Sequence, residues 1–113
     1  MAPTLGDFEQ LILMALVRLG PEAYGVTVRQ EIEQRTGRTI SAGALYTALD
    51  RMEKRGFVSS RLGDPTPQRG GKRKRLYSVE PPGERALARV YDSLRAMATG
   101  MTARLRGAKP ETH

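Results

Sequence analysis

The stretch SAGALYTALDRMEKRGFVSSRL, residues 41–62, joins two hydrophobic patterns of different period. In its first part Leu45, Leu49 and Met52 recur at three- and four-residue spacing, which is typical of a helix with one apolar face. The hydroxyl of Ser41 can cap the first turn of that helix. In the last part, FVSSRL, β-branched and aromatic residues favour a strand. The stretch therefore predicts a capped helix of about residues 41–56 that leads directly into a strand.

The opposite face of this helix is small and polar. At 100° per residue, this face carries Gly43, Thr47, Asp50 and Lys54, and Tyr46 and Arg51 flank it. By composition alone it is an ordinary solvated face. However, a glycine near the start of the helix lets another backbone approach closely, and the free amides of the first turn favour a phosphate.

The rest of the chain supplies further elements on either side. The patterns predict helices over Leu5–Leu19, Tyr24–Arg35 and Arg85–Leu105, and antiparallel strands over Phe57–Leu62 and Lys74–Val79. Three helices followed by a hairpin form the plan of a winged helix-turn-helix. The predicted fold class is thus mainly α with a small β-hairpin, a winged helix-turn-helix at 5–80 plus a C-terminal dimerisation helix at 81–106. We expect a frayed tail at 107–113.

The charge of the protein is concentrated in the hairpin. The 113 residues carry a net charge of +7, with a pI near 10.4, which favours a polyanionic partner. Between Phe57 and Val79 the cations are Arg61, Arg69, Lys72, Arg73, Lys74 and Arg75, and Asp64 is the only acid. The wing, which we define as residues 63–75, is therefore expected to bind DNA through Arg69, Gly70, Gly71, Lys72, Arg73 and Lys74. Alternatively, it is a solvated loop. Lys74 and Arg75 begin the strand, and one of them could face solvent for solubility only.

In helix-turn-helix proteins the second helix of the motif enters the major groove. We accordingly expect DNA contacts from Ser41, Gly43, Tyr46, Thr47 and Arg51. Two of these residues have alternative interpretations. Tyr46 could pack beside Leu49, and Arg51 could pair with Asp50 or Glu53. Tyr24, in the preceding helix, is interpreted as a packing residue.

An apolar seam in the last predicted helix favours a homodimer. Leu87, Leu94 and Met101 are seven residues apart, which resembles a heptad seam, although Gly100 weakens the helix by about 1 kcal/mol. The first helix also has excess apolar surface. The expected dimer residues are Leu11, Leu87, Val90, Tyr91, Leu94, Met97 and Met101. The alternative is that the seam belongs to the intramolecular core.

Other classes of protein have little support in the sequence. The chain has no cysteine and no internal histidine, and it lacks a phosphate-binding loop and metal-type carboxylate clusters, so we expect neither an enzyme nor a metal or cofactor. No apolar run approaches the roughly 20 residues of a membrane span, and we expect a cytoplasmic protein. The alternative function is a protein-interaction module that uses the amphipathic C-terminal helix.

The sequence resembles the PadR family of bacterial transcriptional regulators over roughly residues 8–90. The resemblance rests on Gly20-Pro21 followed by Tyr24-Gly25, on GALYTALDRMEKRGFV, and on the basic wing that runs into RLYSVEPPGERAL. It implies a homodimeric DNA-binding repressor whose C-terminal helix completes the dimer. It also allows a small-molecule effector, which no residue pattern here identifies. The segment EPPGER departs from the more usual Thr-Pro-Ala-Gly, which affects a helix cap and not the fold.

Overall fold

A computed structural model describes residues 5–64 and 73–107 of the chain. Its elements are α1 (Asp7–Leu19), the short 3-10 helix η1 (Gly20–Glu22), α2 (Gly25–Thr36), α3 (Ala42–Lys54), β1 (Val58–Leu62), β2 (Arg75–Val79), α4 (Pro81–Ala98) and α5 (Thr102–Arg106). The strands pair in antiparallel register, from Val58 opposite Val79 to Leu62 opposite Arg75. The predicted fold class, mainly helical with a small hairpin, is confirmed.

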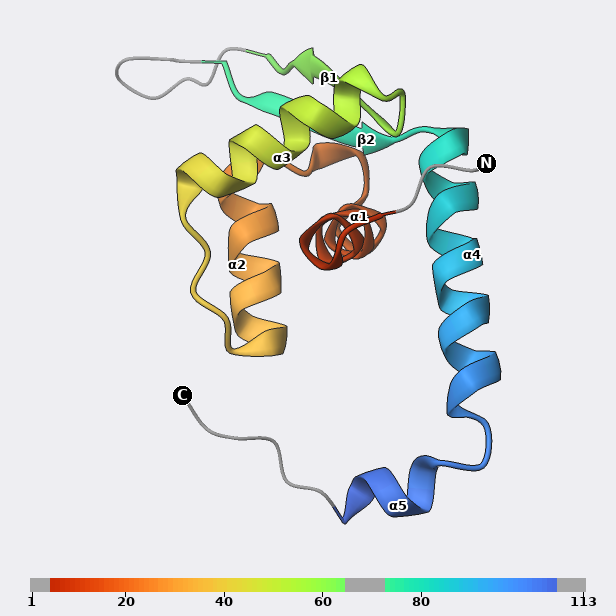
Figure 1. Cartoon of the computed structure of the whole chain (residues 1–113). Helices are drawn as coiled ribbons and strands as arrows, with labels where there is room; N and C mark the ends of the chain where they lie inside the picture. Colours follow the sequence, from red (N-terminus) through yellow and green to blue (C-terminus); the bar gives the residue numbers. More distant parts are fainter. Residues whose placement is uncertain (1–4, 65–72, 108–113) are drawn as a thin grey trace.

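Helix α1 lies at the centre of the molecule. Helix α2 packs on one side of it and α4 on the other, while α3 and the hairpin cover it from above (Figure 1). Its residues Ile12, Leu13 and Leu16 are buried and join the side chains of α2, α3 and the hairpin in one core. The apolar face of α1 is wider than one stripe because several elements surround it.

Glycines end the first two helices of the chain, α1 and α2. Gly37 ends α2 with a φ of 73°, a left-handed conformation that glycine adopts without strain. Gly20 takes a φ of 79° directly after α1, and Pro21 lies in the turn that follows.

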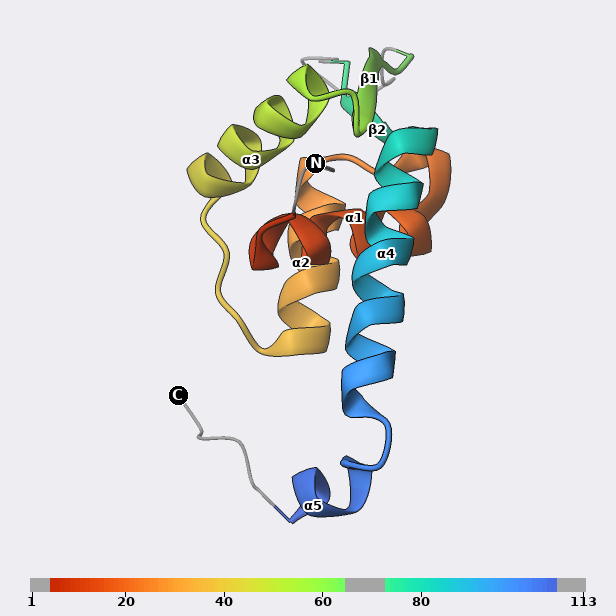
Figure 2. The same cartoon turned by 45° about the vertical axis from the view of Figure 1, so that its right-hand side comes forward.

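The prediction of one continuous C-terminal helix to Leu105 was wrong. Helix α4 starts at Pro81 and stops at Ala98, and Gly100 then takes a φ of 85°, where the chain turns into the separate helix α5 (Figures 1 and 2). The sequence identified Gly100 as a weak point of the helix. The helix ends before Gly100 because all residues from Tyr91 to Ala98 are exposed. Tertiary packing therefore does not offset the poor helix propensity of glycine.

The start of α4 packs unusually close to the hairpin. A Cβ atom added at Gly83 would lie 2.3 Å from the carbonyl oxygen of Phe57, so only glycine allows this approach. The amide of Glu80 donates to the same carbonyl oxygen at 2.9 Å. The Glu80 side chain makes no cap hydrogen bond to α4, which agrees with the altered cap expected from EPPGER. The helix is thus attached to the domain through backbone contact at its first turn.

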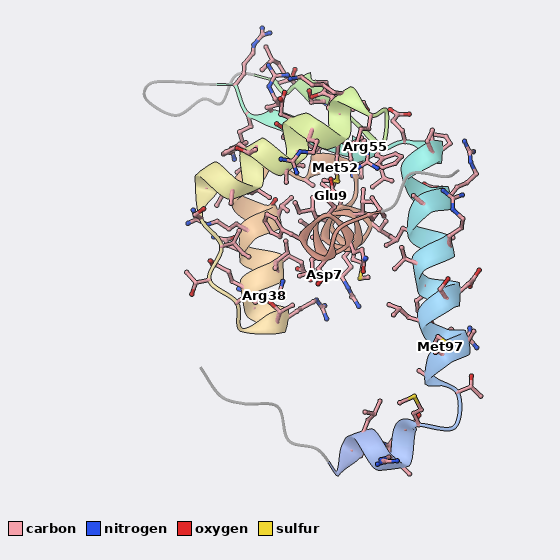
Figure 3. The ribbon with its side chains drawn as sticks, viewed as in Figure 1. Asp7, Glu9, Arg38, Met52, Arg55 and Met97 are labelled. Atoms are coloured by element: carbon pink, nitrogen blue, oxygen red, sulfur yellow. The ribbon has the colours of Figure 1, made fainter. Side chains whose placement is uncertain are left out.

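An ion pair joins the start of α1 to the end of α3. The Glu9 carboxylate is buried; its Oε1 accepts from the amide of Gly6 at 2.8 Å, and its Oε2 lies 3.4 Å from Nη1 of Arg55 (Figure 3). The Arg55 guanidinium also lies over the ring of Phe57, 4.6 Å from the ring centroid. The carboxylate therefore satisfies both a helix-start amide and a partly buried cation.

Candidate nucleic-acid interface

Helix α3 separates an apolar face from an exposed polar face. Leu45, Leu49 and Met52 are fully buried, and Met52 points toward α1 (Figure 3). The predicted cap is present, since Ser41 Oγ accepts from the amide of Ala44 at 3.1 Å. The exposed face of the helix presents Ser41, Gly43, Thr47, Asp50 and Arg51 to solvent. All five predicted recognition residues, Ser41, Gly43, Tyr46, Thr47 and Arg51, therefore lie on exposed positions of one helix or its cap.

Gly43 is not required by the internal packing of the domain. A Cβ atom added there would meet no described atom within 4 Å, and the residue has no positive φ. Glycine therefore costs helix stability here without relieving any clash within the described residues. This agrees with the interpretation that the position is kept small for close approach of a partner.

Tyr46 has both a packed and an exposed part. Its side chain is 47% exposed, and its hydroxyl end lies directly on Gly25, where an added Cβ would approach Oη to 2.1 Å. The sequence suggested Leu49 of the same helix as a packing neighbour and missed Gly25, which begins α2. The signal was available in the Tyr24-Gly25 pair, but only the fold brings that pair to α3.

Arg51 remains available for a partner. Of the two neighbours considered as its ion-pair partners, Asp50 pairs with Lys54 at 3.0 Å and Glu53 accepts a hydrogen bond from Ser60 at 2.8 Å. In the part of the chain that the structure describes, no ion pair or hydrogen bond of the Arg51 side chain is formed. The alternative pairing of Arg51 with Asp50 or Glu53 is thus absent there, and the residue is exposed.

The hairpin uses two of its cations internally. Arg61 Nη2 lies 3.4 Å from both Pro21 O and Glu22 Oε1, which ties β1 to η1. Arg75 Nη1 donates to Ser60 Oγ at 3.0 Å, and Ser60 in turn donates to Glu53 of α3. These two arginines stabilise the attachment of the hairpin. Fewer of the hairpin's cations are therefore available to a partner than its total number of Lys and Arg residues indicates.

The described end of the wing carries two further cations. Arg73 and Lys74 are both exposed. The Lys74 ammonium lies 4.3 Å from the centroid of the Tyr24 ring, and Tyr24 also forms a β-bridge with Leu76. The packing interpretation of Tyr24 therefore agrees with the structure, although its partner is the hairpin. The remaining predicted wing residues, Arg69, Gly70, Gly71 and Lys72, lie outside the described residues.

Behind α3, the fold buries the phenol of Tyr77. The residue is 5% exposed, and this burial raises the pKa of the phenol above its usual value of 10.0; Arg75 opposes the rise, while Glu53, Tyr46 and Asp50 add to it. The neutral phenol is thus the form that the fold favours.

The predicted dimer residues fall into two groups. Leu11, Leu87 and Val90 are partly buried against the core of their own chain, as the intramolecular alternative required. Tyr91, Leu94, Met97 and Met101 are exposed, and Met97, on the lower part of α4 in Figure 3, is 77% exposed. Between α1 and α4 lies an open hollow of about 580 Å³, lined mainly by Met14, Val17, Leu87, Ala88 and Tyr91.

In residues 5–64 and 73–107 no three His, Cys, Asp or Glu side chains are grouped as metal ligands. Across the same ranges no helix combines the length and the apolar character needed to cross a bilayer.

A capped helix with an exposed polar face, preceded by the helix α2 and followed by a cationic hairpin, defines the winged helix-turn-helix class. Residues 12–89 match the model of the transcriptional regulator PadR-like family. The chain therefore belongs to this family, whose members are transcription regulators rather than enzymes, and it is a DNA-binding regulator.

Solved structures have the same fold. A PadR family transcription regulator from Clostridium difficile is 24% identical with a TM-score of 0.71, covering 88% of this chain and 99% of that one. A PadR-like transcriptional regulator from Bacillus cereus is 20% identical, with a TM-score of 0.68 and coverages of 90% and 93%. A PadR family regulator from Eggerthella lenta is 25% identical, with a TM-score of 0.64 and coverages of 85% and 81%. No curated protein matches the sequence.

The contact between Tyr46 and Gly25 can be tested by Gly25→Ala. Alanine favours a helix more than glycine does, so propensity alone would make the variant more stable. We expect instead a loss of about 1–3 kcal/mol in the free energy of unfolding, because the added methyl group displaces the Tyr46 ring. The measurement is chemical denaturation at fixed protein concentration. In a Tyr46→Ala background the same change should be neutral or stabilising, and an equal loss in both backgrounds would contradict the contact.

The buried phenol predicts a loss of stability at high pH. Because the folded-state pKa of Tyr77 is raised, its contribution is complete below about pH 10 and is lost as the pH rises through the folded-state value. As the pH rises above about 10, we expect the unfolding free energy of the protein to fall relative to that of its Tyr77→Phe variant. Denaturation at increasing pH measures it, and Tyr91→Phe, at an exposed position, is the control. A difference that does not change with pH would count against this assignment.

Proposed function

We propose that the protein is a homodimeric repressor of transcription that inserts α3 into the major groove and lays the wing on the flanking backbone or in the minor groove. The exposed face of α3 carries the proposal. Its apolar stripe is buried completely, while Gly43, Thr47 and Arg51 are exposed at the start and middle of the helix. Side chains near the start of such a helix reach base edges in helix-turn-helix complexes.

Each residue of α3 has a different proposed role. Thr47 can donate a hydrogen bond to a base and touch a thymine methyl with its own methyl group. Arg51 supplies a charge for a phosphate, and the free amides at the start of the helix near Ser41 favour another. Tyr46 can donate from its hydroxyl, although its packing on Gly25 restricts the directions in which it reaches.

The wing is proposed to bind the DNA backbone without contributing to sequence specificity. Arg73 and Lys74 are exposed at its described end, and Arg69, Gly70, Gly71 and Lys72 belong to the proposal on the basis of the sequence. Phosphate contacts of this kind fix the position of a protein on the duplex, while base contacts determine specificity.

The proposed dimer is formed by α4 and α1. Only Gly83 and Ala86 of the 18 residues in α4 are buried, whereas Tyr91, Leu94 and Met97 are exposed apolar side chains on one helix. A patch of this kind is commonly an interaction site. A second copy related by a two-fold axis can cover it with the same patch, and the hollow between α1 and α4 adjoins it at Leu87 and Tyr91.

The alternative, a protein-interaction module that uses only the C-terminal helix, has one specific observation in its favour, the same exposed face of α4. It leaves unexplained both the cations of the wing and the exposed Arg51. A cytoplasmic location is part of the proposal, and the identity of any small-molecule effector is not.

The decisive experiment is a footprint on random genomic fragments, followed by binding to the recovered site. We expect two protected half-sites related by a two-fold axis, and a site that overlaps a promoter would support repression. With about six to ten phosphate contacts per dimer, log K should fall with log salt by about 0.9 per contact. Binding that hardly changes with salt would contradict the proposal.

Substitutions distinguish contacts to the DNA backbone from contacts to bases. Arg73→Ala should weaken binding to the recovered site and to a mixed-sequence duplex equally, and reduce the salt slope by about 0.9 per copy. Thr47→Ala should weaken the recovered site by about 1–3 kcal/mol and leave the mixed-sequence duplex unchanged. Arg89→Ala, which removes an exposed cation on α4, is the control for charge alone.

The dimer is tested by charges placed on the exposed face of α4. The double variant Leu94→Glu, Met97→Glu should sediment as a folded monomer, because two carboxylates cannot be buried in an apolar seam without partners. Both positions are exposed in the protomer, so we expect unchanged helical content by circular dichroism. Val26→Glu, at an exposed apolar position of α2, should remain dimeric. A dimer of unchanged stability in the double variant would refute this interface.

A further inference from the structure

We infer that Tyr24 is a positioning residue for DNA binding: its ring holds the Lys74 ammonium at the base of the wing, oriented toward a phosphate. The inference rests on the proposed function and assigns a contact that the wing as a whole does not specify. Three features support it: the attachment of Tyr24 to the hairpin, the position of Lys74 over its ring, and the packing of Tyr46 of α3 on the adjacent Gly25.

Tyr24 is fixed on both sides. It precedes α2, where its amide donates to Thr27 Oγ1 at 3.1 Å and its carbonyl oxygen accepts from the same hydroxyl at 3.0 Å. Toward the hairpin, it forms a bridge with Leu76, and the carbonyl oxygen of Ala23 accepts from the amide of Tyr77 at 2.8 Å. The backbone of the residue is therefore held by an isolated β-bridge beside β2 and by Thr27, and its side chain is half-buried.

Lys74 lies two residues before Leu76, directly before β2. Its backbone is also held, because the carbonyl oxygen accepts from the amide of Gly63 at 2.7 Å. Nζ is 4.3 Å from the centroid of the Tyr24 ring, well inside the distance of about 6 Å at which a cation is attracted to an aromatic face. An exposed lysine otherwise samples many rotamers, and the ring reduces this freedom before any ligand binds.

The ammonium keeps its donors available while it rests on the ring. A cation–π contact occupies only the side of the ammonium that faces the ring, so the N–H groups on its other side can still donate to phosphate oxygens. Among the described residues, Lys74 has no ion pair, in contrast to Arg61, which pairs with Glu22. Arg75, the next residue, is likewise engaged with Ser60.

The location matches the path of a DNA backbone in the proposed complex. Tyr24 adjoins Gly25, on which the Tyr46 side chain of α3 lies. Lys74, at the base of the wing, and Tyr24 therefore lie beside the point where Tyr46 of α3 packs, close to both surfaces proposed to bind DNA. A phosphate between the groove contact and the wing contact would face this ammonium. Tyr24 thus acts through Lys74 without touching DNA itself.

The test is a double-mutant cycle on a mixed-sequence duplex, where phosphate contacts dominate. Tyr24→Phe keeps the aromatic face and should bind like the original protein. Tyr24→Leu should weaken binding about two- to fivefold, the factor expected for an exposed cation–π contact. Lys74→Leu should weaken binding further and lower the salt slope by about 0.9 for each copy. In the Lys74→Leu background, Tyr24→Leu should have no additional effect.

The outcomes separate this inference from the proposed function. If the unmodified protein binds with a steep salt dependence but Tyr24→Leu has no effect, or has the same effect in both backgrounds, the positioning role is wrong and DNA binding stands. If the unmodified protein shows no salt-dependent binding, the proposed function fails and the inference with it. Thermal melting of each variant provides the control for folding, and the Lys74 Hε chemical shifts report whether the ring contact is lost in Tyr24→Leu.

Discussion

The burial of one stripe of α3 is the constraint on which the rest of this structure depends. Leu45, Leu49 and Met52 have no exposed surface, and each fully buried side chain of this size contributes about 1.5–3 kcal/mol. Because successive side chains are 100° apart around a helix, burying one face of α3 also determines which residues face solvent. The exposure of Gly43, Thr47 and Arg51 is therefore a consequence of core packing. Any partner that reads this helix meets a surface whose orientation was set by the hydrophobic core.

The hairpin could not hold such a position alone, since two strands are marginally stable in water. Besides the burial of Val58, Leu76 and Tyr77 in the core, polar contacts attach it. These are the bridge from Tyr24, the Arg61 pair with Glu22, and the chain from Arg75 through Ser60 to Glu53. The last of these links both strands to α3. Individual exposed polar contacts contribute little, about 0–1 kcal/mol each, but together they fix the angle of the wing relative to the helix. Basic residues in this region thus serve two purposes, and only contacts in the fold distinguish them.

This division explains what could be predicted from the sequence. The elements, the Ser41 cap and the stops at Gly20 and Gly37 depend on local periodicity and backbone preference, which the sequence carries directly. Three other features depend on how distant segments pack, or fail to pack, against each other. The contact of Tyr46 with Gly25 and the approach of Gly83 to Phe57 join residues that only the fold brings together. Gly100 ends α4 because that part of the helix lacks buried neighbours, which periodicity cannot reveal; the heptad-like spacing of Leu87, Leu94 and Met101 predicted continuity instead.

The exposed end of α4 links the architecture to the proposed mode of binding. The first turn of α4 is attached firmly through Gly83, while beyond Val90 no residue of the helix is buried. In the proposed dimer this free end packs on its counterpart, so the angle of the first turn sets the distance between the two α3 helices. Half-sites one helical turn apart, about 34–36 Å, require that distance to be fixed. A flexible attachment at residues 80–83 would let this distance vary. This gives a physical reason for placing Gly83 against the carbonyl of Phe57, where α4 meets the hairpin.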